Sequence, residues 1–173
     1  MFDILSRIRR TGRLSETGPQ AGKATASDPL QSKLHQTFGR ALCIRQVDAG
    51  SCNGCELEIQ ALGNPYYNLE GSGIHFVASP RHADLLLVTG PVSVNMEEAL
   101  KRTYQAMPKP KWVIAVGDCG ACGGIFGTSY ASRGSVGNII PVDAMVNGCP
   151  PSPTALMQAI VDVTTGMPQS GQG

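Results

Sequence analysis

Charged residues and long hydrophobic runs are both scarce in this 173-residue chain. Only 16% of the residues are charged, which is too few for a disordered or highly solvated chain. No apolar run reaches the roughly 18 residues that a membrane-spanning helix needs, because the longest one is interrupted by Asp84, Gly90 and Pro91. The N-terminal sequence MFDILSRIRR also lacks the apolar stretch of a secretory or twin-arginine export signal. The sequence therefore predicts a cytoplasmic protein of ordinary domain size.

The charge that is present is unevenly distributed along the chain. Residues 1–40 contain seven Lys or Arg and three Asp or Glu, whereas residues 41–173 contain seven and ten. Because the basic excess belongs to the first 40 residues, we expect no binding of nucleic acid by the rest of the chain. We predict a partly flexible N-terminal extension over 1–40, one domain over 41–166 and a tail over 167–173.

Expected strands and helices alternate from residue 41 onwards. The strands are expected at 41–47, 74–78, 84–89, 112–116 and 139–142, and the helices at 56–62, 96–107 and 154–163. The run DLLLVT over 84–89 is typical of a strand that is buried on both faces. This alternation predicts an α/β domain with a mostly parallel sheet, in which sites form beyond the C-terminal ends of the strands.

Five of the six cysteines lie in three short segments that follow expected strands. They are Cys52 and Cys55, then Cys119 and Cys122, then Cys149. In a reducing cytosol such cysteines are free, catalytic or metal-ligating, because structural disulfides are rare there. Since the segments follow parallel strands, we expect them to gather at one edge of the sheet.

The chemistry of these segments leaves three kinds of site open. Two residues between cysteines let both thiolates reach one metal centre, and the dense glycine of 117–124 lets the backbone approach a bulky iron–sulfur cluster. Tetrahedral zinc is the competing structural site, although zinc ligands usually come in two close pairs and the third segment offers one cysteine. A single CxxC pair is also found in thiol redox proteins. The residues favour iron–sulfur over zinc and over redox thiols.

Several motifs, in the same order, resemble one family. They are CNGCELE over 52–58, SPRHAD over 79–84, TGPV over 89–92, GDC over 117–119, GGIF over 123–126, PVD over 141–143 and GCPPSP over 148–153. This family comprises the small subunit of nickel–iron hydrogenases and the related 20 kDa-type cluster-bearing subunit of respiratory complex I. The resemblance spans about residues 41–165. It implies a flavodoxin-like fold, with helices flanking the sheet, cysteine loops at the C-terminal edge of the strands and one 4Fe–4S cluster.

The first cysteine motif distinguishes the branches of this family. Complex I subunits have two adjacent cysteines there, whereas this chain has Cys52-x-x-Cys55. The chain also shows neither the export signal nor the C-terminal cluster domain of periplasmic uptake hydrogenases. It most resembles the energy-converting, membrane-associated hydrogenases of the formate hydrogenlyase type. This resemblance implies that the cluster ligands are Cys52, Cys55, Cys119 and Cys149.

The same resemblance implies an electron-transfer subunit of a larger complex. The cluster would relay electrons between a nickel–iron site in a large subunit and ferredoxin-like iron–sulfur subunits, and the chain alone would have no turnover. With membrane subunits, the complex would lie on the cytoplasmic face of the inner membrane. One alternative is the same relay in a complex I-like assembly that is linked to quinone. An alternative of another class is a zinc-stabilised interaction module.

Five further residues are each compatible with more than one role. Cys122 stands where a small non-ligand residue is expected, so we interpret it as a small buried residue or an alternative ligand. Glu58 is a candidate for moving protons or tuning the cluster, although carboxylates are also favoured in the first turn of a helix. Arg81 and His82 are expected on the site side of the sheet, either tuning the cluster or forming interface ion pairs. Asp118 either caps a turn or adjusts the charge of the cluster.

Cys43 lies within the first expected strand and away from the three cysteine segments. A free cysteine in a strand commonly packs as a small hydrophobic residue. We therefore expect Cys43 to have no part in the site.

Overall fold

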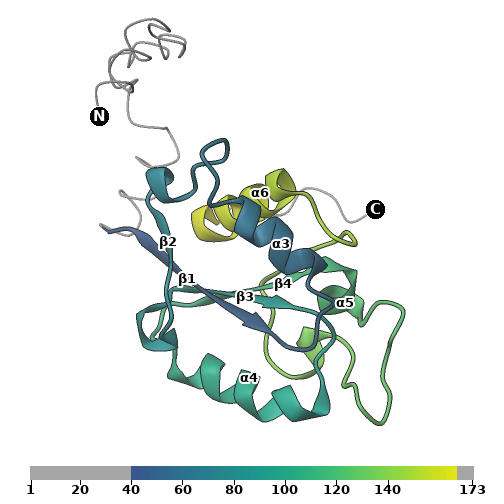
Figure 1. Ribbon diagram of the computed structural model, residues 1–173. Coiled ribbons are helices and arrows are strands. Elements are labelled where there is room, and N and C mark those ends of the chain that lie inside the picture. The colour runs from purple at the N-terminus through teal and green to yellow at the C-terminus, as the bar shows by residue number, and fades with distance from the viewer. Residues whose placement is uncertain (1–39, 167–173) are drawn as a thin grey trace, which may run out of the picture.

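A parallel sheet of five strands forms the centre of the part that the computed structural model describes, residues 40–166 (Figure 1). The strands are β1 (Leu42–Asp48), β2 (Ile74–Phe76), β3 (Leu85–Thr89), β4 (Trp112–Val116) and β5 (Ala144–Val146). They stand in the order β2-β1-β3-β4-β5, and every neighbouring pair is parallel. This order is that of the flavodoxin-like folds, so the predicted α/β class is confirmed.

Helices flank the sheet on both faces. They are α3 (Gly54–Ala61), α4 (Val94–Ala106), α5 (Gly117–Cys122) and α6 (Pro153–Thr165), with 3-10 turns η1 (Glu70–Ser72), η2 (Pro80–His82) and η3 (Val136–Asn138). Figure 1 shows α3 and α6 over one face and α4 over the other. Serine hydroxyls cap α4 and α6, because Ser93 accepts from the backbone N–H of Met96 and Ser152 from that of Ala155, both at 3.3 Å.

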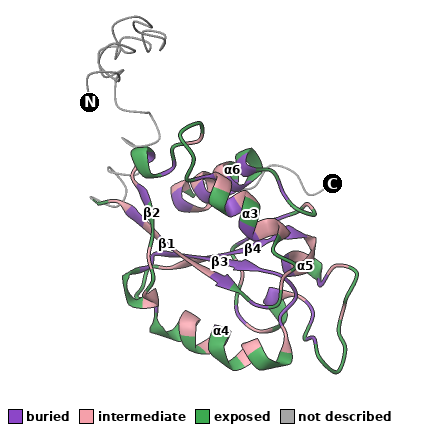
Figure 2. Cartoon of the chain, viewed as in Figure 1, coloured by how far each residue is buried: buried purple, intermediate pink, exposed green. Residues whose placement is uncertain are grey.

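The central strand β3 belongs to two apolar cores at once. Leu85 and Leu87 pack in the core beneath α3 and α6, whereas Leu86 and Val88 pack in the core beneath α4. All five residues of β3 are buried, as Figure 2 shows for the middle of the sheet. Burying a leucine side chain contributes about 1.5–3 kcal/mol, so this strand anchors both layers. The prediction of a strand buried on both faces is confirmed.

The last strand lies later in the chain than its hydrophobic pattern predicts. We expect a strand at 139–142, but β5 comprises Ala144–Val146, and Ile140 instead packs into the core beneath α4. The pairing begins at Asp143, whose backbone N–H donates to the carbonyl of Val113 at 2.9 Å. Its side chain also accepts from the N–H of Val113, at 2.7 Å. These two bonds set where the chain joins the sheet, and hydrophobicity alone does not reveal them.

The second cysteine segment also departs from expectation, because it is a short helix and not a loop. Gly117 has a φ of 79° at the end of β4, and Gly123 has a φ of 89° directly after the helix. These left-handed conformations are costly for any residue with a Cβ atom, so the two glycines bound α5.

Parts of the predicted domain organisation lie outside the described residues. Except for Arg40, the expected extension over 1–40 is not among them, and neither is the tail over 167–173. Within residues 40–166, no helix is long and apolar enough to cross a membrane.

Candidate metal centre

The three cysteine segments meet at the C-terminal edge of the sheet. A cavity of about 140 Å³ opens there, between the loops that follow β1, β3, β4 and β5. In this strand order the chain reverses its direction of winding between β1 and β3, and such switch points are where doubly wound sheets bind ligands. The cysteines that line the cavity are Cys52, Cys55, Cys119 and Cys149.

The remaining two cysteines are not part of this lining. Cys122 is exposed at the end of α5, where its thiol lies 3.2 Å from the carbonyl oxygen of Asp118 in the same helix. The interpretation of Cys122 as a small buried residue is therefore wrong. Cys43 is half-buried in β1, and all six cysteines are free of disulfides. The structure thus brings together the four cysteines that the family resemblance implies as ligands.

Two glycines leave room for the thiols. A Cβ atom on Gly117 would lie 2.6 Å from the sulfur of Cys55, and one on Gly124 would lie 2.8 Å from the sulfur of Cys119. Both glycines have positive φ, of 79° and 55°. Any larger residue would therefore be strained itself and would displace a thiol from the cavity.

Two aspartates fix the loops that hold the cysteines. Asp48 accepts from the backbone N–H groups of Gly50 at 2.8 Å and Ser51 at 2.7 Å, which shapes the turn before Cys52. Asp118 makes a reciprocal contact with Gly148. Its carboxylate accepts from the N–H of Gly148 at 2.7 Å, while its own N–H donates to the Gly148 carbonyl at 3.0 Å. Asp118 therefore holds the Cys149 loop to α5. This role differs from both roles that the sequence suggests for Asp118, which are to cap a turn or to adjust the charge of the cluster.

The thiols influence one another electrostatically. Burial, together with the negative charge of Glu56 and of the other three lining cysteines, raises the pKa of Cys55 to about 11. The pKa of Cys119 is also raised, first by burial and then by Cys149 and Cys52. In the metal-free chain these two thiols are therefore protonated at neutral pH. A bound metal centre would have to displace their protons.

Glu56 is a buried carboxyl, whereas the sequence suggests for it only a favourable charge in the first turn of a helix. Only 6% of its surface is exposed, and neither carboxyl oxygen has a hydrogen-bond partner among the described residues. The sequence does contain a signal for the burial of Glu56. Glu56, Ile59 and Leu62 are spaced by three and therefore share the inner face of one helix. Glu58, the favoured candidate, is half-buried and does not line the cavity.

Arg81 and His82 are exposed in η2 and do not line the cavity either. The reason is the shortness of β2, whose last residue Phe76 pairs with Ile44 in the first half of β1. The chain then turns back to enter β3 at Leu85, which pairs with the same Ile44. The turn between the two strands therefore never reaches the C-terminal edge where the cysteines lie, and a tuning role for Arg81 and His82 stays a prediction.

The comparisons with known proteins agree with the sequence resemblance. The family described as "NADH ubiquinone oxidoreductase, 20 Kd subunit" matches residues 52–163, and this chain belongs to that family. A Pyrococcus furiosus protein named "Probable membrane-bound hydrogenase subunit mbhJ" is 45% identical over 130 residues, covering 75% of this chain and 78% of the relative. Formate hydrogenlyase subunit 7 of Escherichia coli is 43% identical over 128 residues, covering 74% of this chain and 50% of the relative.

Solved structures show the same fold. A chain of the membrane-bound sulfane sulfur reductase, an archaeal respiratory membrane complex, is 31% identical with a TM-score of 0.64, covering 80% of this chain and 77% of the other. A chain of an NAD⁺-reducing [NiFe]-hydrogenase has a TM-score of 0.60 at 18% identity, covering 77% of this chain and 96% of the other, which is a likeness of fold alone. The relatives are subunits of hydrogenase and oxidoreductase complexes, so the predicted assignment to an oxidoreductase subunit is confirmed.

Proposed function

We propose, with membership of this family as the premise, that the chain holds one 4Fe–4S cluster and transfers electrons through it within a larger complex. The observation that carries the proposal is the single cavity lined by four cysteine thiols from three separate segments. The proposed ligands are Cys52, Cys55, Cys119 and Cys149. Because two of these, Cys52 and Cys149, are exposed, the cavity opens at the surface, where a partner can approach it.

The donor set suits an iron–sulfur cluster better than a single ion. Four thiolates are the usual ligands of a 4Fe–4S cluster. Tetrahedral zinc also accepts four thiolates, but it requires them to converge on one point. Within residues 40–166, no three Cys, His, Asp or Glu side chains are arranged to hold one ion. The four cysteines instead line a cavity of about 140 Å³, which offers room for a larger group.

When bound, a 4Fe–4S cluster supplies the transfer of one electron at a time. The residues of this chain hold the site in shape: Asp48 fixes the Cys52 loop and Asp118 fixes the Cys149 loop. The side chains of Phe126 and Pro150 contribute apolar surface to the cavity wall. Such surface limits the access of water, which influences the potential of a bound cluster.

The proposed partners are those that the family resemblance implies. A large subunit with a nickel–iron site would exchange electrons with the cluster, and a ferredoxin-like subunit would carry them further. Membrane subunits would hold the assembly at the cytoplasmic face of the inner membrane. The names of the Pyrococcus furiosus and Escherichia coli relatives support the part of this arrangement that concerns a membrane-bound hydrogenase complex.

A second candidate is the same relay serving an acceptor other than protons, such as a quinone. The likeness to the sulfane sulfur reductase chain and the membership of a complex I family favour it. The sequence of the large partner subunit separates the two candidates. Paired CxxC motifs near both of its ends would provide nickel ligands and favour the hydrogenase, whereas their loss would favour the other acceptor.

The proposal is tested by loading the full chain with iron and sulfide under anaerobic conditions. We expect about four irons per chain and a low-temperature 4Fe–4S signal by EPR after reduction. Cys149→Ser should abolish the signal, whereas the matched control Cys122→Ser should keep it, because the Cys122 thiol does not line the cavity. A chain that binds one zinc and no iron, while a control ferredoxin loads normally, would overturn the relay and support an interaction module.

A further inference from the structure

The segment between α5 and η3 exposes three large apolar side chains. We call residues 123–134 the docking loop; it extends away from the body of the molecule (Figure 1). Ile125 is 94% exposed, Tyr130 is 98% exposed and Phe126 is 58% exposed. Side chains this exposed add little to the stability of the isolated chain, and a cluster of them is typical of a surface that binds another protein.

Hydrogen bonds at its base hold the docking loop in place. The backbone N–H of Arg133 donates to the carbonyl of Val92 at 2.7 Å, and that of Val92 donates to the carbonyl of Gly134 at 2.9 Å. Within the loop, the hydroxyl of Ser132 donates to the carbonyl of Gly127 at 2.9 Å and accepts from the N–H of Gly134 at 3.1 Å. These bonds hold the stretch from Gly127 to Gly134, which carries Tyr130, in a defined shape before any partner arrives. Such preorganisation lowers the entropic cost of binding.

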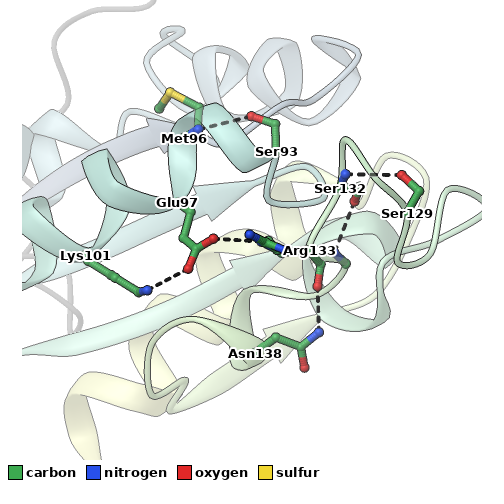
Figure 3. Close-up of polar contacts among 9 residues, drawn as sticks. Ser93, Met96, Glu97, Lys101, Ser129, Ser132, Arg133 and Asn138 are labelled. Carbon is green, nitrogen blue, oxygen red and sulfur yellow. Dashed lines mark hydrogen bonds and ion pairs between the residues drawn. The ribbon is translucent and has the colours of Figure 1, made fainter.

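Glu97 joins the docking loop to helix α4. Figure 3 shows its carboxylate between two cations, with one oxygen 2.6 Å from the ammonium of Lys101 and the other 2.7 Å from Nε of Arg133. Lys101 belongs to the same helix, whereas Arg133 belongs to the loop. The hydrogen bonds from Lys101 and Arg133 hold the pKa of Glu97 below its ordinary value, so both ion pairs are present at neutral pH. The side chain of Asn138 also donates to the carbonyl of Arg133, at 2.8 Å.

We propose that the docking loop inserts into an apolar groove of the partner subunit that covers the cavity, and that the Glu97–Arg133 ion pair presets its shape. The proposal rests on the proposed function, because it takes the partner to be the one that exchanges electrons at the cavity. Phe126 connects the two features, since it lines the cavity and is also exposed on the loop. A partner that closes over the cavity therefore meets the loop. The loop contains no Asp or Glu, so its occupant offers an apolar surface and not a cationic one.

The docking surface is tested by hydrogen exchange on the intact complex and on the isolated, cluster-loaded chain. We expect residues 124–131 to exchange more slowly in the complex, together with residues 147–152 beside the cavity. Protection of 147–152 alone would overturn the docking loop while leaving the proposed function standing. Protection of neither segment would show that no partner covers the cavity and would overturn both.

The role of the ion pair is tested by the fraction of each variant that stays in the complex during purification. Arg133→Gln should weaken retention about two- to fivefold, the effect of losing one partly exposed ion pair, and Arg133→Lys should restore most of it. Tyr130→Ser should weaken it about tenfold or more, as for an interface anchor. Lys101→Gln and Glu98→Gln are matched controls on α4, since Lys101 binds Glu97 from within the same helix and Glu98 pairs with Arg102.

Iron content separates these effects from damage to the site. All of the variants should keep the iron and EPR signal of the original chain, because none of the changed side chains lines the cavity. Equal weakening by Arg133→Gln and Arg133→Lys, or by Lys101→Gln, would show that the ion pair does not preset the loop. Normal retention of Tyr130→Ser would overturn the docking surface itself.

Discussion

Removing the carboxylate of Asp118 should weaken both the fold and the proposed cluster site. In Asp118→Ala, the N–H of Gly148 loses an acceptor that lies 2.7 Å away in a partly buried position. A hydrogen bond to a charged group contributes about 1.5–3 kcal/mol, and partial exposure places this one at the lower end. We therefore expect the free energy of unfolding to fall by about 1.5 kcal/mol, as measured by urea denaturation of the cluster-free chain.

The second consequence of Asp118→Ala concerns retention of the cluster. The Cys149 loop would be held to α5 by one bond from the Asp118 backbone instead of by two bonds. Losing a group that orients a metal ligand commonly lowers metal affinity by about tenfold or more. We expect loss of iron to a chelator, followed by the fading of visible absorbance, to be faster by about that factor. Asp118→Asn keeps an oxygen acceptor and should recover most of the stability.

Asp143 provides a matched control for this prediction. Its carboxylate accepts from the backbone N–H of Val113, also at 2.7 Å and also in a partly buried position, but at the opposite end of β4. Asp143→Ala should therefore lose similar stability without losing iron faster. If Asp118→Ala and Asp143→Ala release iron at the same rate, the reasoning about the Cys149 loop is wrong.

Two further predictions concern the thiol and the carboxyl beside the site. In the cluster-free chain, burial raises the pKa of Cys55 to about 11 from 9.0, so its rate of alkylation, measured by peptide mass spectrometry, should still rise between those pH values. The stability linked to this shift is present below pH 9 and is lost as the pH rises towards 11, and an alkylation plateau at pH 9 would contradict the shift. Glu56→Met should raise the free energy of unfolding of the isolated chain by about 1–3 kcal/mol, because a buried carboxyl without a partner is costly. A loss of stability in urea denaturation would show that Glu56 has a partner.

Much of the fold could be predicted because its signals are local. The run over 84–89 predicts β3, and Pro153 after a serine predicts the start of α6, since proline is well tolerated in the first turn. The prediction of a strand at 139–142 was wrong because the apolar residues there reflect a tertiary contact and not a local structure. Residues Ile139 and Ile140 are apolar because they pack beneath α4, and apolar character does not distinguish a packed turn from a strand.

The candidate site likewise has features that local sequence predicts and features that depend on tertiary pairing. The spacing of Cys52 and Cys55 and the glycines around Cys119 are local, and with the family motifs they predict the proposed ligands from the sequence alone. The positions of Arg81 and His82 depend on the length of β2, which is decided by its pairing with β1. The sequence near residue 80 gives no indication of that pairing. The expectation that Arg81 and His82 lie on the site side of the sheet was therefore wrong.

The sequence by itself determined the family, the alternation of strands and helices and the choice of candidate ligands, because residue type and spacing express each of these directly. The tertiary structure decided which cysteines share a cavity, that Asp118 holds the Cys149 loop and that Glu97 holds the docking loop. Those contacts join residues about 30 or more positions apart. They exist only once the strands have taken their order in the sheet, and that order is a property of the whole packed chain.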